Sequence, residues 1–193
     1  MHIYINDTKF DVNENDTIIQ VADRNDIHIP RFCYHKRLSI VASCRMCLVD
    51  IENMKYPQPA CSTIVKEGMR VNTNNRSAEE AQKNTMEFLL INHPLDCPVC
   101  DQAGECELQD VSLEHGDYKS AYKELKRTVI DKNIGELIST EMTRCIHCSR
   151  CVRFGEEVAG IKELGMTGRG EDTKIETFIN ESLSSQLSVS YTH

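Results

Sequence analysis

The sequence contains ten cysteines in three groups, and these are its candidates for a chemical role. The last group, RCIHCSRC, sets Cys145, Cys148 and Cys151 at three-residue intervals. This spacing matches three of the four ligands in the bacterial ferredoxin motif, whose thiolates hold a 4Fe-4S cluster. No cysteine follows Cys151, so the sequence predicts a 4Fe-4S site that lacks its fourth ligand. His193 is the one substitute in the tail, and a terminal histidine is expected to fray.

The first group of cysteines predicts a 2Fe-2S site. Its members are Cys33, Cys44, Cys47 and Cys61, with the spacing C-x10-C-x2-C-x13-C. Four thiolates are the ligands that a two-iron cluster needs, and small residues beside the close pair leave backbone amides free to donate hydrogen bonds to sulfur. A zinc site uses the same four ligands and stays open as the alternative.

The second group, HPLDCPVCDQAGEC, joins His93 to Cys97, Cys100 and Cys106. An imidazole in place of one thiolate makes a cluster site less negative and tends to raise its reduction potential. A lone histidine before proline is usually a polar loop residue, but this histidine precedes three closely spaced cysteines. We therefore predict a 4Fe-4S site with mixed ligands, and a short zinc knuckle is the alternative.

Composition and charge narrow the class of protein. The chain has 193 residues, no tryptophan and 6% aromatic residues, so a bound metal would supply folding free energy that a small core cannot. Its start carries no secretion signal, which favours metal ligation over disulfides. The net charge of -8 argues against nucleic-acid binding. The longest aliphatic run, Phe88 to Ile91, is too short to span a bilayer, so we expect membrane association only through partners.

The elements that position the first group of cysteines are predicted to form a small α+β domain. Alternating apolar residues in HIYIN and FDVN predict a hairpin with its turn at Asn6 and Asp7. Asp16 is expected to cap a short helix that ends near Asn25. Alternation returns in CLVDIENM and MRVNTN, which predict further strands. The fold class is therefore α+β, with an N-terminal β-grasp 2Fe-2S ferredoxin-like domain followed by small loop-rich or helical 4Fe-4S cluster-binding domains.

A longer helix is predicted over RSAEEAQKNTMEFLLINHP, where Ser77 and Glu80 form a capping-box pattern and Phe88 lies on the face of Ala78. The basic segment YKSAYKELKRTVIDKN is expected to be a solvated helix face, with a docking patch as the alternative. We divide the chain into three domains: a 2Fe-2S ferredoxin-like domain at 1-76, a linking helix with the mixed-ligand 4Fe-4S domain at 77-143, and an incomplete 4Fe-4S ferredoxin-like domain at 144-193.

The remaining polar residues predict no catalytic site and no cofactor beyond the clusters. No nucleophile and base can be paired, and GMTGRG has the wrong order for a dinucleotide-binding turn. His35, His115 and His147 are not expected to be cluster ligands, because the three groups are nearly complete. The arginines around the third group are either ordinary surface charges or cations that stabilise a reduced cluster.

Three stretches carry a resemblance to a known family: HPLDCPVCDQAGECELQD, DKNIGELI and MTRCIHCSRCVRFGEEVAGIKELGMTGRGED. They resemble the N-terminal iron-sulfur region of the large peripheral subunit of respiratory complex I, the NADH:quinone oxidoreductase, in its mitochondrial and alphaproteobacterial form. The likeness extends through CYHKRLSIVASCRMCLVD. In that family the matching residues hold one 2Fe-2S and two 4Fe-4S clusters, which implies these ligand sets: Cys33, Cys44, Cys47 and Cys61; His93, Cys97, Cys100 and Cys106; and Cys145, Cys148 and Cys151.

The resemblance also implies where the missing ligand belongs. The family's fourth ligand to the last cluster is a cysteine followed by proline, shortly after a segment resembling SSQLS, and here the pattern departs into VSYTH. The ligand is therefore expected beyond the end of this sequence, in a shifted reading frame, or from a partner chain. A cluster with an open corner, 3Fe-4S or labile, is the alternative.

The function implied by the resemblance is electron transfer within NADH:ubiquinone oxidoreductase, with no substrate chemistry on this chain alone. Electrons would enter from a flavin-bearing partner subunit and leave toward quinone, among the other subunits of the peripheral arm. The expected location is the matrix side of the mitochondrial inner membrane or the cytoplasmic face of a bacterial inner membrane. The alternatives are an iron-sulfur subunit of a soluble NAD-linked hydrogenase or formate dehydrogenase, and a zinc-binding structural scaffold.

Overall fold

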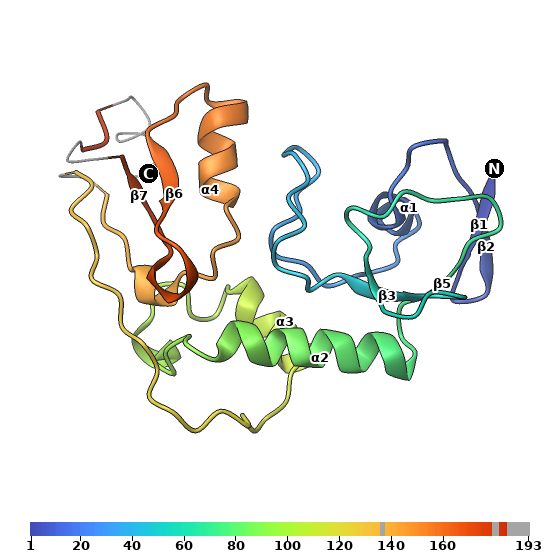
Figure 1. Cartoon of the computed structure of the whole chain (residues 1–193), viewed down its shortest axis with the longest axis horizontal. Helices are drawn as coiled ribbons and strands as arrows, with labels where there is room; N and C mark the ends of the chain where they lie inside the picture. The colour runs from blue at the N-terminus through green and yellow to red at the C-terminus, as the bar shows by residue number, and fades with distance from the viewer. Residues whose placement is uncertain (136–137, 179–181, 185–193) are drawn as a thin grey trace. The chain divides into compact units, whose positions relative to one another are not determined.

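The computed structural model describes residues 1–135, 138–178 and 182–184, and it divides into two compact units (Figure 1). Unit 1 comprises Met1–Tyr34, Ile40–Ile91 and Asp96–Lys123. Unit 2 comprises His35–Ser39, Asn92–Leu95 and the chain from Glu124 onward. The domain boundaries after residues 76 and 143 stay predictions.

Unit 1 contains a five-stranded mixed sheet with the strand order β2-β1-β5-β3-β4. Strand β1 pairs antiparallel with β2 and parallel with β5, which in turn pairs antiparallel with β3. Asn6 (φ 50°) and Asp7 (φ 64°) make a two-residue turn of the left-handed kind that hairpins favour. The predicted hairpin is confirmed. The strands are β1 (His2–Ile5), β2 (Thr8–Asp11), β3 (Leu48–Ile51), β4 (Gln58–Pro59) and β5 (Arg70–Asn72).

Helix α1 (Ile18–Arg24) begins one residue later than the sequence predicts. Its N-cap is Thr17, whose backbone N–H donates to Gln20 Oε1 at 2.8 Å. The prediction of Asp16 as the cap is wrong, because the Asp16 carboxylate is taken by the Arg24 guanidinium at the other end of the helix. That ion pair lowers the pKa of Asp16.

The core of unit 1 is formed by β1, α1 and the middle strands of the sheet. Ile3 and Ile5 are fully buried on β1, and Ile18 and Ile19 on α1. Two of the cysteines belong to this same cluster of buried side chains, namely Cys47 and Cys61. The first predicted metal site is therefore built into the core.

Helix α2 (Arg76–Leu90) is capped by Asn75, whose Oδ1 accepts from the backbone N–H of Ala78 at 3.0 Å. The predicted capping box at Ser77 is wrong, because Ser77 lies inside the first turn. Its hydroxyl lies 3.4 Å from the carboxylate of Asp50 on β3.

The buried face of α2 consists of Ala78, Gln82 and Met86. Gln82 donates through Nε2 to the backbone carbonyl of Leu48 at 2.9 Å, which places this polar residue against β3. Phe88 is 72% exposed and does not share that face, contrary to the prediction. Helix α3 (Glu107–His115) packs against α2, and the short helical turn η1 (Cys97–Val99) precedes it.

The basic segment from Tyr118 to Asn133 is irregular, and the predicted helix is wrong. Tyr118 is 95% exposed and Leu125 is 96% exposed, so its large apolar side chains gather on no buried face. Helical stability in proteins comes mostly from packing such a face, and good propensity alone does not replace it.

Unit 2 contains a short helix and a hairpin. The helical turn η2 (Met142–Arg144) leads to α4 (Arg150–Arg153), which continues into the π-helical turn η3 (Phe154–Val158). Strands β6 (Leu164–Thr167) and β7 (Lys174–Thr177) pair antiparallel and are joined through the turn η4 (Gly170–Asp172). The GMTGRG segment thus forms β6 and the connection that follows it. Within the described residues no helix has the length and hydropathy needed to cross a bilayer.

Candidate metal centres

The first four cysteines are buried together in unit 1. Cys44 and Cys47 lie in the loop that leads into β3, and Cys61 lies two residues after the end of β4. The pairing of those strands fixes their spacing, since the N–H of Ala60 donates to the carbonyl of Cys47 at 2.9 Å. Cys33 lies in the segment that leaves α1. The sheet therefore assembles a set of thiols that the sequence distributes over 29 positions, from 33 to 61.

Hydrogen bonds connect these thiols in a row. Cys33 accepts from Cys44 and Cys61, and Cys47 accepts from Cys61, so the pKa values of Cys33 and Cys47 are lowered. The pKa values of the donors Cys44 and Cys61 are raised for the same reason. A full set of four buried thiolates needs a cation to offset their repulsion and desolvation, and metal binding supplies it.

Backbone amides also point at the sulfur atoms. The N–H of Cys33 donates to Cys44 Sγ at 3.4 Å, and the N–H groups of Met46 and Cys61 donate to the sulfurs of Cys44 and Cys47. The loop can turn in this way because Ala42, at φ 50°, adopts a left-handed conformation. Hydrogen bonds to sulfur are one of the features that set the potential of iron-sulfur clusters, so the residues fit such a group.

The spacing of the sulfurs bears on the choice between zinc and a two-iron cluster at the first site. Among the described residues, which include all ten cysteines, no three cysteine sulfurs lie within 4.8 Å of one another. One zinc ion bound to four thiolates at about 2.3 Å would bring every pair of sulfurs to about 3.8 Å. A two-iron cluster with two thiolates on each iron needs close sulfurs only within each pair. The spread arrangement favours the polynuclear cluster.

The cysteines of the second group lie around the turn that precedes α3. Cys97 begins η1, and the N–H of Cys100 donates back to its carbonyl at 3.1 Å. Cys106 is the N-cap of α3, where the positive end of the helix dipole favours an anionic ligand. These three residues belong to unit 1 and His93 to unit 2, so the mixed ligand set stays a prediction.

The third group surrounds a loop with two left-handed residues, His147 (φ 53°) and Ser149 (φ 56°). The N–H of His147 donates to Cys145 Sγ at 3.4 Å, which repeats the amide-to-sulfur contact of the first site. The His147 ring Nε2 lies 2.9 Å from the carbonyl of Thr173. This histidine therefore anchors the loop to the hairpin of unit 2.

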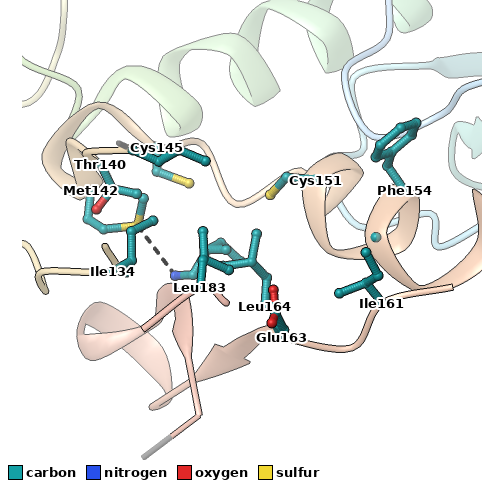
Figure 2. Close-up of a pocket in the computed structure, with 13 residues that line it drawn as sticks. Ile134, Thr140, Met142, Cys145, Cys151, Phe154, Ile161, Glu163, Leu164 and Leu183 are labelled. Atoms are coloured by element: carbon teal, nitrogen blue, oxygen red, sulfur yellow. Dashed lines mark hydrogen bonds between the residues drawn. The ribbon is translucent and has the colours of Figure 1, made fainter. Parts of the chain in front are cut away.

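A cavity of about 300 Å³ opens beside this loop, and Figure 2 shows Cys145 and Cys151 on its wall. Burial raises the pKa of the Cys145 thiol. The remaining lining is mostly apolar: Ile134, Met142, Phe154, Ile161, Leu164 and Ile175. The predicted gap in this ligand set and its substitute, His193, lie outside the described residues.

Arg153 has a role that the sequence did not reveal. Its side chain is buried, and its guanidinium donates to the carbonyls of Ser39 at 2.6 Å and Cys148 at 3.2 Å. The N–H of Ser39 in turn donates to the Glu157 carboxylate at 2.7 Å. Arg153 therefore holds the cysteine loop in place. No local pattern pointed to the contacts with Ser39, because Ser39 lies more than 110 residues before Arg153 and Glu157 in the chain.

Three family models match successive parts of the chain. Residues 1–76 match a 2Fe-2S iron-sulfur cluster binding domain, and residues 82–120 match the iron-sulfur binding region of NADH-ubiquinone oxidoreductase-G. Residues 135–192 match the ferredoxin-like domain of NADH-quinone oxidoreductase subunit 3. The fold, the buried thiols and these matches define an iron-sulfur protein with 2Fe-2S and 4Fe-4S binding domains.

Curated relatives identify the kind of iron-sulfur protein. The chain is 48% identical over 188 residues to the NADH-ubiquinone oxidoreductase 75 kDa subunit of Reclinomonas americana, covering 97% of this chain and 27% of the relative. It is 50% identical over 172 residues to the mitochondrial NADH dehydrogenase [ubiquinone] iron-sulfur protein 1 of Solanum tuberosum, covering 89% and 23%. The 78 kDa subunit of Neurospora crassa is 46% identical over 190 residues, covering 97% and 26%.

The resemblance to the large iron-sulfur subunit of complex I is thus confirmed, and the chain spans about a quarter of the length of these relatives. The fold is confirmed by a chain from the crystal structure of an NAD+-reducing [NiFe]-hydrogenase in the H2-reduced state. It superposes with a TM-score of 0.79 over 96% of this chain and 80% of the other, at 20% identity.

Proposed function

We propose that the chain is an electron-carrying iron-sulfur subunit of NADH:ubiquinone oxidoreductase. In this role it receives electrons from a flavin-bearing subunit and passes them on toward quinone. The proposal is supported by relatives that are 46–50% identical over most of the chain and are named as subunits of NADH-ubiquinone oxidoreductase or NADH dehydrogenase. The hydrogenase likeness, at 20% identity, supports the fold and does not favour the alternative function.

The observation that carries the proposal is the first thiol set, whose four buried sulfurs are connected by thiol hydrogen bonds, with backbone amides donating to Cys44 and Cys47. Iron-sulfur clusters supply one-electron transfer when they are bound. The chain's residues hold the ligands in one geometry, aim N–H groups at sulfur and exclude water. No nucleophile or proton carrier is required of them.

The proposed ligands are those that the sequence predicted. Cys33, Cys44, Cys47 and Cys61 would hold a 2Fe-2S cluster, and His93, Cys97, Cys100 and Cys106 a 4Fe-4S cluster. Cys145, Cys148 and Cys151 would hold a second 4Fe-4S cluster, with its fourth ligand outside the residues that the structure describes. The amide-to-sulfur contacts at Cys44 and Cys145 support the first and third sets.

The names of the relatives support the proposed cellular location. Two of them carry the word mitochondrial in their names, which supports a position on the matrix side of the inner membrane among peripheral subunits. The equivalent bacterial setting is the cytoplasmic face of the inner membrane. Attachment to the membrane would be through those partners.

The test is iron and acid-labile sulfide analysis with low-temperature EPR on the full chain, reconstituted anaerobically and reduced with dithionite. We expect one 2Fe-2S signal together with 4Fe-4S signals, and the Cys61→Ser variant should lose only the first. Cys97→Ser is the matched control and should keep the 2Fe-2S signal. A colourless protein that contains zinc and no sulfide would end the electron-transfer proposal.

A further inference from the structure

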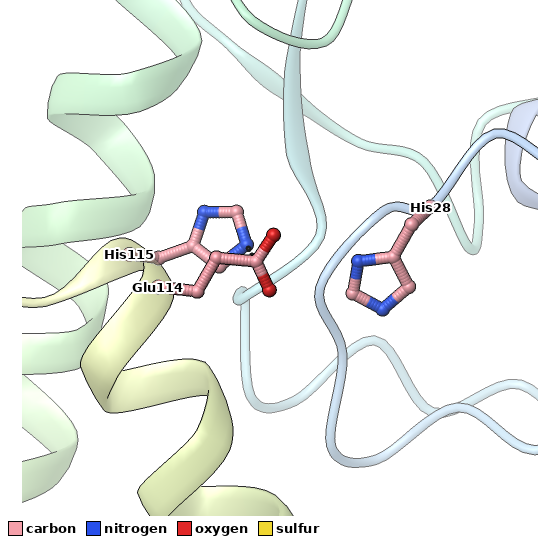
Figure 3. A group of neighbouring side chains, drawn as sticks. All are labelled: His28, Glu114 and His115. Atoms are coloured by element: carbon pink, nitrogen blue, oxygen red, sulfur yellow. Dashed lines mark ion pairs between the residues drawn. The ribbon is translucent and has the colours of Figure 1, made fainter.

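Outside the cysteine groups, three potential metal ligands of unit 1 meet: His28, Glu114 and His115 (Figure 3). His28 lies in the segment after α1, whereas Glu114 and His115 are the last two residues of α3. One ligand atom of each lies within 4.8 Å of the other two. In the described part of the chain, no other set of three His, Cys, Asp or Glu residues meets this condition.

The environment of His115 is unusual for a histidine. Its Nε2 atom is shielded from solvent and has no hydrogen-bond partner, although buried polar atoms are normally paired. Glu114 Oε2 is its nearest charged neighbour, at 3.6 Å, which is longer than a hydrogen bond. Two ligands bound to one ion at about 2.1 Å with tetrahedral angles lie about 3.4 Å apart. The spacing therefore fits two ligands of a shared cation better than a direct contact.

Charge and ligand type support the same conclusion. An imidazole ring in its neutral form offers a lone pair to a metal ion. Glu114 contributes a negative charge, and both Glu114 and His115 lie where the helix dipole of α3 is negative. A cation at this position would be stabilised by each of these features.

We propose that His28, Glu114 and His115 form a binding site for a divalent transition-metal ion of the zinc type, separate from the iron-sulfur sites. Two imidazoles with one carboxylate suit zinc, nickel or copper, whereas magnesium and calcium prefer oxygen ligands. Three protein ligands leave a fourth position for water. The bound ion would link the segment after α1 to the end of α3, two parts of unit 1 that are far apart in the sequence.

Cadmium-113 NMR on the full chain with its clusters reconstituted tests this site, because the cadmium shift separates nitrogen and oxygen ligands from thiolates. Cadmium that enters a cysteine site is therefore recognised by its own resonance. We expect one resonance from a site of nitrogen and oxygen ligands in the wild type. The His28→Ala variant should lose it, since His28 is an exposed residue whose replacement leaves α3 intact.

The matched control is His35→Ala, which removes another exposed histidine of the chain and should keep the resonance. Glu114→Gln should weaken cadmium binding at least about tenfold, because even the loss of an outer partner of a metal site has an effect of that size. The proposal is overturned if the wild type gives no such resonance, or if the resonance survives unchanged in His28→Ala.

Discussion

At the scale of single residues, the thiols of the first site do two jobs. Cys47 and Cys61 are fully buried members of the core of unit 1, and they are also proposed ligands. Independently of any metal, Cys47 accepts a hydrogen bond and Cys61 donates one. Packing in the core therefore already restricts the positions of the side chains that would hold iron. This restriction holds the sulfur atoms in the arrangement that a metal site needs.

Arg153 gives a residue-scale prediction. Replacing it with glutamine removes the charged donors that hold the carbonyls of Ser39 and Cys148. We expect the free energy of unfolding to fall by about 1–3 kcal/mol, because two partly buried backbone carbonyls lose their charged donor. Chemical denaturation of the reconstituted chain, followed by circular dichroism and by cluster absorbance, measures this change.

Arg169→Gln is the control for Arg153→Gln, since it removes the same charge from an exposed position. It should change the free energy of unfolding by no more than about 0.5 kcal/mol. Equal effects of the two variants would show that Arg153 acts only as a surface charge.

The candidate ligands that could be predicted from the sequence are those that lie close to one another along the chain. Close cysteine pairs and triplets are visible in a single loop, because one loop supplies several ligands to one cluster. The contacts of Arg153 and the meeting of His28 with His115 depend on tertiary folding, and no spacing in the sequence reports them. His115 was not expected to be a ligand because the three cysteine groups were already nearly complete.

At the scale of elements, Asn75 offers a direct test of where α2 begins. The Asn75→Ala variant removes the side-chain acceptor of the Ala78 N–H and also the hydrogen bond to Asp50 at 2.7 Å. We expect it to lower the free energy of unfolding by about 1–2 kcal/mol, the upper range for helix caps. Thermal or chemical denaturation of the reconstituted chain provides the measurement.

Ser77→Ala is the comparison, because the sequence pattern alone would make Ser77 the cap. We expect a change within about 0.5 kcal/mol, since its hydroxyl makes only a long contact with Asp50. A larger loss in Ser77→Ala than in Asn75→Ala would mean that the helix begins at the position the sequence predicted.

Both helix starts were misplaced by one or two residues for a physical reason. Asp16 and Ser77 are good capping residues, but the Asp16 carboxylate is paired with Arg24, and Ser77 lies inside the first turn of α2. The neighbouring Thr17 and Asn75 then take the cap positions. The positions of the strands were predicted more accurately, because a half-buried strand shows an alternation of apolar and polar residues that is visible in the sequence.

At the scale of the whole molecule, folding and metal binding should be coupled. Unit 1 has a small core that contains two of the proposed ligands, and a metal that binds only the folded state stabilises it. We expect the reconstituted chain to melt at a higher temperature than the chain stripped of iron. Circular dichroism at matched protein concentration under anaerobic conditions measures both.

The control for that comparison is Cys61→Ser, which cannot complete the first site. Its melting temperature should rise less on reconstitution than that of the wild type. Identical melting of the stripped and reconstituted wild-type chains would contradict the coupling.

The chain passes between the two units five times, at residues 34–35, 39–40, 91–92, 95–96 and 123–124. Neither unit is therefore a continuous piece of the sequence. During synthesis the ribosome must release Lys123 before unit 1 has all its parts, and by then unit 2 has already received its first two segments. A single cut in the chain therefore cannot separate the two units, and each needs segments from both sides of the other.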